Sequence, residues 1–209
     1  MHWTKHKAQK RNVNNNNRER TNLIPTYVHA KSEESNFLGL RVPVNKFITN
    51  LALDLKGNTL ILYSRVQAHG SVLYSMINTN KSDERKVFFV HGGVDVEDRE
   101  EIRRLTELST NSIIIASYGT FYTGINIKRL HNVIFASPSK SRVRNLQSIG
   151  RVLRKGENKS QATLYDIADD ISTDRGNNYT LNHLTERVKV YNEEKFQYEI
   201  IDVKLKAYD

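Results

Sequence analysis

Five short apolar runs recur along the chain and constrain its fold more than any other feature. They are rich in Ile, Val, Leu, Phe and Tyr and do not alternate with polar residues, which is the pattern of strands buried on both faces. Their starts are roughly 20 to 30 residues apart, at 59–63, 86–90, 112–116, 132–136 and 162–167. Polar segments with helical spacing lie between them, notably 94–108 and 140–154. The sequence therefore predicts an α/β protein with an open, mostly parallel sheet and helices on both faces.

Two further segments flank these runs. Residues 42–57 have the pattern of a helix that ends at Gly57 and leads into the first strand, and residues 179–206 are typical of a helix followed by a short strand. A length of 209 residues suffices for one α/β core of ordinary size. We therefore expect three parts: a basic, largely disordered arm or linker over 1–40, the α/β domain over 41–170, and a C-terminal helix-strand extension over 171–209.

The first 22 residues are strongly basic and contain few apolar side chains. They hold six Lys or Arg, one Glu and the run NVNNNN, in a chain whose formal net charge is +9. Such a segment cannot bury enough apolar surface to offset the entropy lost on ordering, so we expect it to be disordered. Two interpretations stay open: a solvated tail without a partner, or an arm that contacts nucleic-acid phosphates.

Composition excludes several classes of site. The chain has no cysteine, which rules out disulfides and thiolate zinc sites. His2 and His6 are interpreted as residues of the arm, so no metal site is predicted. No apolar run has the length of a membrane span or the character of a signal peptide. We therefore expect a cytoplasmic protein without a membrane partner.

Polar and glycine-containing segments follow the predicted strands. Because ligands bind at the carboxyl ends of strands in an open parallel sheet, these segments are the first place to look for a site. They read SRVQAHG after 59–63, HGGVDVEDRE after 86–90, SYGTFYTGIN after 112–116 and SPSKSR after 132–136.

The segment QSIGRVLR, residues 147–154, carries a cationic stripe. On a helix, Gln147, Arg151 and Arg154 share one face, and two guanidiniums one turn apart suit a terminal phosphate. Gly150 costs about 1 kcal/mol relative to alanine in a helix, and it leaves room for a ligand or a neighbouring backbone. The alternative interpretation is a solvated basic face with an accidental glycine.

Four segments together resemble the conserved motifs of superfamily 2 helicases. QSIGRVLR matches their sixth motif, QxxGRxxR, and is followed by a predicted strand ending in Asp166. Residues 116–138 resemble the fifth motif, 59–70 the fourth, and 90–100 the HG…R segment between those two. In this order, over about 55 to 170, they resemble the second, C-terminal RecA-like domain. The tail RVKVYNEEKFQYEI is also similar to that of phage UvsW-type helicases, which the chain resembles most. If the chain is encoded by a phage, the expected location is the cytoplasm of the host cell.

The resemblance implies roles for particular residues. Arg151 and Arg154 would be arginine fingers that stabilise the terminal phosphates of ATP, and Gln147 would link the nucleotide state to domain closure. Three further residues would lie at the nucleotide: Gly124, Gly150 and Asn126, the last at a position where many relatives have an Asp that touches the ribose. A nucleic-acid track, on DNA or possibly RNA, would be lined by residues that contact phosphates rather than bases: Ser64, Arg65, Gly92, Gly93 and Thr120.

Two parts of a complete helicase motor are missing from the chain. The P-loop pattern GxxxxGK[ST] is absent, and GENKS at 156–160 lacks the glycine before its lysine. DERK at 83–86 resembles the acidic, metal-holding motif of such a motor, but it precedes a predicted strand instead of following one. ATP and Mg²⁺ would therefore be held mainly by a partner, a first RecA-like domain with a P-loop and a DExH box, and the isolated chain is predicted to be inactive as an ATPase.

Two functions remain open at this point. The first is the C-terminal motor domain of an ATP-dependent helicase. The second is a non-catalytic nucleic-acid-binding protein that retains the RecA-like fold. The paired arginines favour the first, because a pure binding module does not need them. A Rossmann-type enzyme is excluded because no GxGxxG follows the first strand.

Overall fold

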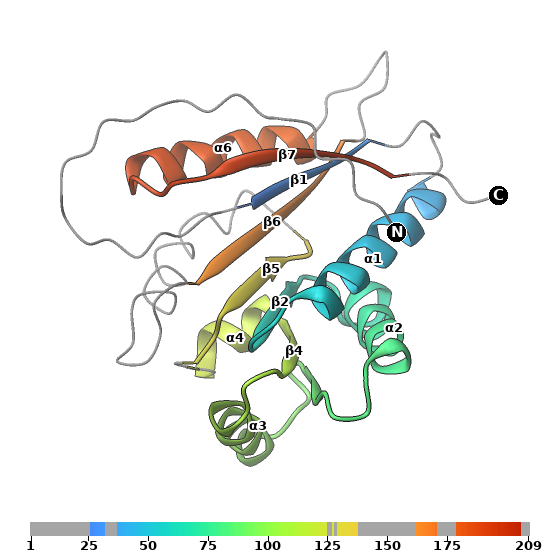
Figure 1. Ribbon diagram of the computed structural model, residues 1–209, viewed down its shortest axis with the longest axis vertical. Coiled ribbons are helices and arrows are strands. Elements are labelled where there is room, and N and C mark those ends of the chain that lie inside the picture. The colour runs from blue at the N-terminus through green and yellow to red at the C-terminus, as the bar shows by residue number, and fades with distance from the viewer. Residues whose placement is uncertain are drawn as a thin grey trace.

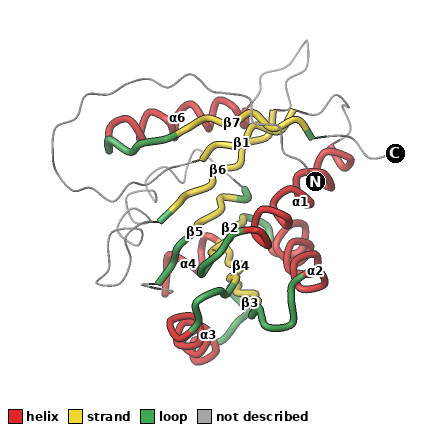
Figure 2. Tube along the Cα trace, in the orientation of Figure 1, coloured by secondary structure: helices red, strands yellow, loops and turns green. Residues whose placement is uncertain are grey.

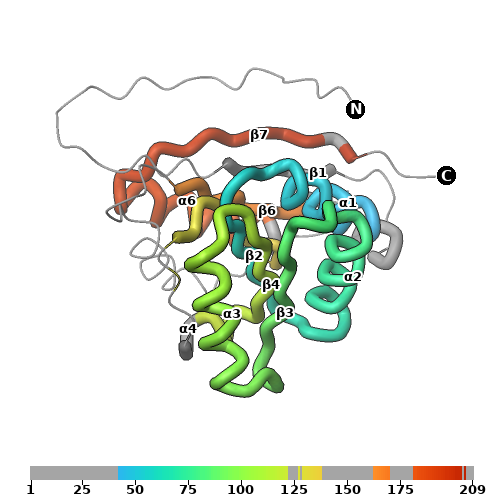
Figure 3. The backbone as a smooth tube through the Cα atoms, turned by 60° about the horizontal axis from the view of Figure 1, so that its bottom comes forward, coloured from blue at the N-terminus to red at the C-terminus, as the bar shows by residue number. Residues whose placement is uncertain are grey.

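A seven-stranded sheet, in which every pair of neighbours is parallel, organises the chain (Figure 1). The computed structural model describes residues 26–31, 37–124, 127, 129–137, 162–170 and 179–205. Its strands are β1 (Thr26–Lys31), β2 (Thr59–Tyr63), β3 (Val87–Val90), β4 (Ile113–Ser117), β5 (Asn132–Phe135), β6 (Thr163–Asp170) and β7 (Glu199–Lys204). The order across the sheet is β3-β4-β2-β5-β6-β1-β7, so β3 and β7 lie at opposite edges (Figure 3).

The helices between these strands cover both faces of the sheet. They are α1 (Phe37–Asp54), the π-helical turn η1 (Val66–Gly70), α2 (Ser71–Asn80), α3 (Val96–Leu108), α4 (Tyr118–Gly124) and α6 (Tyr179–Glu193). Figure 2 shows α1 and α2 next to each other, and their apolar side chains pack on one face of the sheet. Side chains of α3, α4 and α6 pack on the other face. This arrangement confirms the predicted α/β fold.

Alternation within the strands explains why their sequences are apolar without a break. In β2, Leu60 and Leu62 point into the core beneath α3, α4 and α6, whereas Ile61 and Tyr63 point into the core beneath α1 and α2. All four side chains are fully buried. A strand with a helix layer on each side has no solvent-facing positions, so the alternating polar pattern disappears.

β1 lies within the range that the sequence analysis assigned to the basic arm. It pairs in parallel with β6 on one side and with β7 on the other, so residues 26–31 belong to the sheet. Its partners lie more than 130 positions further along the chain, at 165–170 and 199–204, and no local pattern encodes so distant a pairing. The first 22 residues, predicted to be disordered, lie outside the described residues.

Other boundaries shift by a few residues. The helix predicted over 42–57 begins earlier, at Phe37, and ends at Asp54. Gly57 follows it with φ +89°, where a Cβ would stand 2.7 Å from Cγ of His131. The strand expected to end at Asp166 continues to Asp170. The predicted C-terminal helix and strand are present as α6 and β7.

Asn58 joins the loops at the amino edge of the sheet, opposite the strand ends where a site is expected. Its Nδ2 donates to the carbonyl oxygens of Thr106 at 2.9 Å, Ser109 at 2.9 Å and Arg129 at 3.0 Å. Its Oδ1 accepts the backbone N–H of Ser112 at 2.9 Å. This buried side chain therefore satisfies polar groups at the end of α3, in the connection from α3 to β4 and in the connection before β5, which is a structural role.

Candidate functional site

The loops after β2, β3, β4 and β5 meet along one edge of the sheet. In the strand register, Tyr63 is opposite Ser117, Val90 is opposite Ala116, and Leu62 is opposite Phe135. The strands therefore end at nearly the same level. Ser64, Arg65, Gly92 and Gly93 follow those ends directly, so four of the predicted nucleic-acid-binding residues lie along one edge, and all four are exposed.

The loop after β2 forms a π-helical turn before α2 begins. The carbonyl oxygen of Arg65 accepts the backbone N–H groups of His69 at 3.2 Å and Gly70 at 3.0 Å. Single turns of this kind occur frequently at functional sites. The turn leaves the side chains of Ser64 and Arg65 exposed at the start of the loop.

The last residue of this turn is a glycine, Gly70, because the ring of Tyr63 occupies the space that a side chain would need. A Cβ at Gly70 would stand 2.4 Å from Cζ of Tyr63, too close for any side chain without a shift of the ring. The Tyr63 hydroxyl donates to the carbonyl oxygen of Val90 at 3.3 Å, and burial raises the pKa of this phenol to about 12. The glycine thus lets an aromatic ring pack directly under the loop.

His69 connects the loop after β2 with the loop after β5. Its side chain is buried, and its Nδ1 lies 2.7 Å from Oγ of Ser137. Ser137 is the last described residue before the segment that contains the QxxGRxxR motif. The contact therefore fixes the loop after β2 against the point where the chain leaves β5.

The HG…R segment forms a closed loop between β3 and α3. Arg99 donates from Nε to the carbonyl oxygen of Val94 at 2.8 Å and from Nη2 to that of Gly92 at 3.3 Å. The N–H of Val94 donates to the carbonyl oxygen of His91 at 3.0 Å. The spacing of glycine and arginine in the motif is thus explained by an arginine that reaches back from the helix to hold the loop.

Gly92 itself has no neighbour that excludes a side chain. A Cβ there would meet no atom within 4 Å, and its φ is not in the left-handed region. The Cα of Gly92 therefore faces open space, while its carbonyl oxygen is held by Arg99.

Thr120 lies at the same edge but faces inward. It is 4% exposed, and its Oγ1 lies 2.7 Å from Oγ of Ser117. The N–H of Thr120 also donates to that Oγ at 3.2 Å, so Ser117 caps the first turn of α4. Of the five residues predicted to line the nucleic-acid track, Thr120 is the one that is buried.

One of the residues expected to act at the nucleotide falls within the described part of the chain. Gly124 is the last residue of α4. The others lie outside the described residues: Asn126, Gln147, Gly150, Arg151 and Arg154.

A buried ion pair lies beneath the site edge, between β6 and α6. Oδ2 of Asp166 accepts hydrogen bonds from Nε of Arg187 at 2.7 Å and from the hydroxyl of Tyr191 at 2.6 Å. Burial alone would lower the pKa of Arg187, but the Asp166 carboxylate raises it. Burial and then the charge of Asp166 raise the pKa of Tyr191 well above its ordinary value. No sequence pattern predicts this cluster, whose only signal is a carboxylate inside an apolar run.

The DERK segment, rejected as an acidic motif, has a structural role. Arg85 is buried and donates from its two Nη atoms to the carbonyl oxygens of Leu53 at 2.7 Å and Leu55 at 2.8 Å. It thereby caps the carboxyl end of α1. Burial lowers the pKa of its guanidinium. Among the described residues, no cluster of His, Asp or Glu could hold a metal ion.

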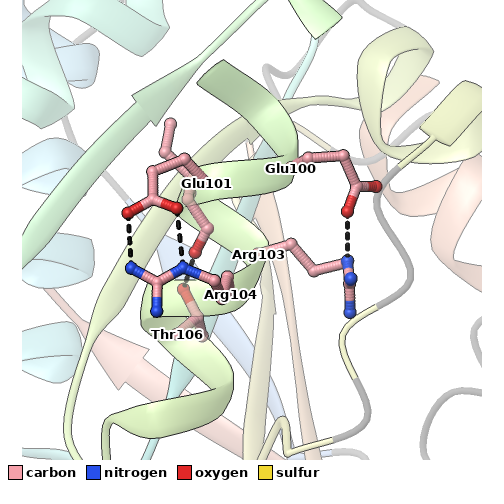
Figure 4. A network of polar contacts seen from close by, with 6 residues as sticks. Glu100, Glu101, Arg103, Arg104 and Thr106 are labelled. Atoms are coloured by element: carbon pink, nitrogen blue, oxygen red, sulfur yellow. Dashed lines mark hydrogen bonds and ion pairs between the residues drawn. The ribbon is translucent and has the colours of Figure 1, made fainter. Parts of the chain in front are cut away.

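Helix α3, next to the HG…R loop, carries many charges that largely cancel. Figure 4 shows Arg103 paired with Glu100 and Arg104 paired with Glu101, each at 2.7 Å. These pairs are exposed, so each contributes little to stability. The first turn of the helix adds two acidic residues, Glu97 and Asp98. The outer face of α3 is therefore not a basic patch.

The basic charge of the protein is concentrated in two segments of the sequence. Residues 1–22 carry six Lys or Arg and one Glu, and residues 138–161 carry seven Lys or Arg and one Glu. Together they exceed the net charge of the whole chain, +9, so the remainder is slightly acidic. In the described ranges, no helix is both long enough and apolar enough to cross a bilayer.

Comparison with known proteins adds to this geometry. The family model of the helicase conserved C-terminal domain matches residues 44–156. The chain is 38% identical over 174 residues to the ATP-dependent DNA helicase UvsW of Enterobacteria phage T4, an alignment that covers 77% of this chain and 34% of that protein. The chain thus spans about a third of this relative.

Solved structures agree with the family match. The crystal structure of T4 UvsW superposes with a TM-score of 0.70 at 31% identity, over 90% of this chain and 42% of that one. The C-terminal domain of the DEAD-box protein Dbp5 superposes with a TM-score of 0.62 at 16% identity, over 88% and 91% of the two chains. The second likeness concerns the fold alone.

Proposed function

Since the chain belongs to the family of helicase conserved C-terminal domains, within superfamily 2, we propose that it is the second motor domain of an ATP-dependent helicase or translocase that acts on DNA. One observation carries this proposal: residues of three family motifs converge on one edge of a parallel sheet inside the matched range 44–156. DNA is proposed because the T4 relative is named a DNA helicase; RNA is the other outcome of a binding test.

The proposed catalytic contribution is a pair of arginine fingers. Arg151 and Arg154 stabilise the charge that develops on the transferring phosphoryl group of ATP, and Gln147 reports the nucleotide state. Gly124, Asn126 and Gly150 lie at the nucleotide in this proposal. ATP and Mg²⁺ are held mainly by a first RecA-like domain, because the chain has no P-loop sequence. The support for these roles is the sequence motif and the family match.

The proposed nucleic-acid track runs along the carboxyl edge of the sheet. Ser64, Arg65 and Gly92 contact phosphates through a hydroxyl, a guanidinium and a backbone amide, so the track reads no base sequence. Gly93 lines the track beside them, with its N–H donated to His91. Thr120 contributes from beneath, by holding Ser117 and the start of α4. Arg99 holds the loop after β3 against α3, and His69 holds the loop after β2 against the loop after β5.

The track is tested by the salt dependence of DNA binding. Neutralising one phosphate contributes about 0.7 to the log–log salt slope on a single strand. We expect Arg65→Ala to make the slope shallower by about one contact. Lys56→Ala is the matched control, because Lys56 is also exposed but lies at the opposite edge, between α1 and β2.

The measurement is the fluorescence anisotropy of a labelled oligonucleotide across a salt series. If wild type and Arg65→Ala have equal salt slopes, Arg65 is not part of the track. If Lys56→Ala makes the slope shallower by as much as Arg65→Ala does, the effect is not specific to this edge of the sheet. Tight binding to one sequence only would contradict backbone recognition. Stronger binding to RNA than to DNA would change the proposed substrate.

The second candidate function is a nucleic-acid-binding protein without catalysis. It is favoured by one observation, the absence of a P-loop sequence from the chain. A protein of this kind would use the same nucleic-acid track, but Arg151 and Arg154 would have no catalytic role. An ATPase assay therefore distinguishes the two functions, whereas a binding assay does not.

A further inference from the structure

A hydrogen bond within the loop after β3 selects one tautomer of the neutral His91 imidazole. The backbone N–H of Gly93 donates to Nδ1 of His91 at 3.1 Å, so Nδ1 is the acceptor and the proton of the neutral ring lies on Nε2. The ring also stands edge-on to Phe89, with centroids 5.1 Å apart and an interplanar angle of 62°. Both contacts orient the same ring, which is a prearranged N–H donor.

The donor atom of this ring is not used inside the described protein. Among the described residues, Nε2 of His91 has no hydrogen-bond partner, and it is not one of the buried polar atoms that lack a partner. Since the side chain is half-buried and this nitrogen is not enclosed, the Nε2–H group opens to solvent. It does so beside the exposed Gly92 and Gly93, on the carboxyl edge of the sheet.

Closure of the loop does not require the imidazole. Arg99 already holds the carbonyl oxygens of Gly92 and Val94, and the backbone of His91 accepts the N–H of Val94 at 3.0 Å. The loop thus has three hydrogen bonds that are independent of the His91 ring. A purely structural role for the ring leaves its outward donor unexplained.

The charged side chains that follow His91 in the loop are either acidic or already engaged. Asp95, Glu97 and Asp98 are exposed at the start of α3, and the nearby guanidinium of Arg99 is occupied with the loop carbonyls. Close approach of a phosphate here must therefore depend on N–H groups rather than on a free cation. A neutral imidazole supplies such a donor with a fixed direction.

We propose that Nε2–H of His91 donates a hydrogen bond to a phosphodiester oxygen of the bound nucleic acid, making His91 a binding residue of the track. The inference rests on the proposed function and adds a residue to it. Because a neutral donor displaces no counterion, its contribution is independent of salt, unlike that of Arg65.

Two variants with an amide side chain distinguish the contributions of the two ring nitrogens of His91. In His91→Asn the short side chain offers its carbonyl oxygen to the Gly93 N–H in place of Nδ1, but it cannot reach the position of Nε2. In His91→Gln the longer side chain brings its NH₂ near the position of Nε2. Both variants are made in the full chain, and their thermal unfolding is compared with that of wild type to verify the fold.

The experiment measures affinity for a fluorescent single-stranded oligonucleotide at pH 8 across a salt series. We expect His91→Asn to bind roughly tenfold more weakly at every salt concentration, as for loss of one hydrogen bond to a charged group. The salt slope stays at the wild-type value, and His91→Gln recovers most of the affinity.

Three results would overturn the inference. Wild-type affinity in a folded His91→Asn variant would show that the ring only positions the loop. If His91→Gln binds the oligonucleotide no more tightly than His91→Asn does, Nε2 is not the donor. A slope reduced by a full contact would show a charged imidazolium. Absence of binding by wild type at low salt would instead contradict the proposed function.

Discussion

Asp166 and Arg187 form an ion pair whose two side chains are 0% and 2% exposed, at the centre of the contact between β6 and α6. Both Nη atoms of Arg187 and Oδ1 of Asp166 are buried without a hydrogen-bond partner among the described residues. Removing one member of such a pair leaves an uncompensated buried charge. The cost of that change far exceeds the net value of the pair itself.

Arg187→Ala is therefore expected to lower the free energy of unfolding by about 3 to 5 kcal/mol. Lys189→Ala is the matched control on the same helix, because Lys189 pairs with Glu186 at 2.8 Å while its side chain is 62% exposed. That exposed pair contributes at most about 1 kcal/mol. Urea unfolding followed by circular dichroism measures both variants. Similar small losses in the two would mean that the buried pair does not anchor α6.

Sequence and structure agree at the residue scale where a simple topological rule applies. Ser64, Arg65, Gly92 and Gly93 could be placed on one edge because parallel strands all end there. The burial of Thr120 could not be read from the sequence, because it depends on Ser117 capping α4. The role of Gly70 was equally hidden, since it follows from the position of the Tyr63 ring.

At the scale of elements, the runs that are buried on both faces and the longer helices α1, α3 and α6 were predicted well, and the short helices were not. β2 was predicted at its observed bounds, 59–63. α2 and α4 were missed because neither carries a long helical pattern, and α4 spans only Tyr118–Gly124. β1 was missed because its neighbours β6 and β7 are distant in sequence.

The place of β1 inside the sheet gives a prediction about truncation. Deleting residues 1–22 removes a segment with few apolar side chains, so we expect the free energy of unfolding to change by no more than about 0.5 kcal/mol. Deleting residues 1–31 also removes the strand between β6 and β7 and leaves their backbone hydrogen-bonding groups unpaired. We expect a clearly lower unfolding midpoint in urea for this second variant only. An equal midpoint for both truncations would show that β1 is dispensable.

At the scale of the whole molecule, a parallel sheet presents its motif loops at one edge, and these loops lie within the range that matches the helicase conserved C-terminal domain. The described part of the chain is not a basic surface, because most of the excess positive charge belongs to residues 1–22 and 138–161. The fold and the convergence of the motif loops at one edge could be predicted because they follow from strand order and motif order. The residues to which the motif assigns catalysis, at 147–154, lie outside the described residues.

ATP hydrolysis is the measurement that tests the central claim most directly. The full chain is assayed with single-stranded DNA, alone and fused to a first RecA-like domain with a P-loop and a DExH box. We expect the chain alone to match a buffer control and the fusion to show DNA-stimulated turnover. In the fusion, Arg154→Ala should reduce turnover by roughly 10³ to 10⁵, the effect of losing an arginine finger, whereas Arg142→Ala, outside the QxxGRxxR motif, should leave it near wild type. Hydrolysis by the chain alone, or equal turnover in the two arginine variants, would contradict the account.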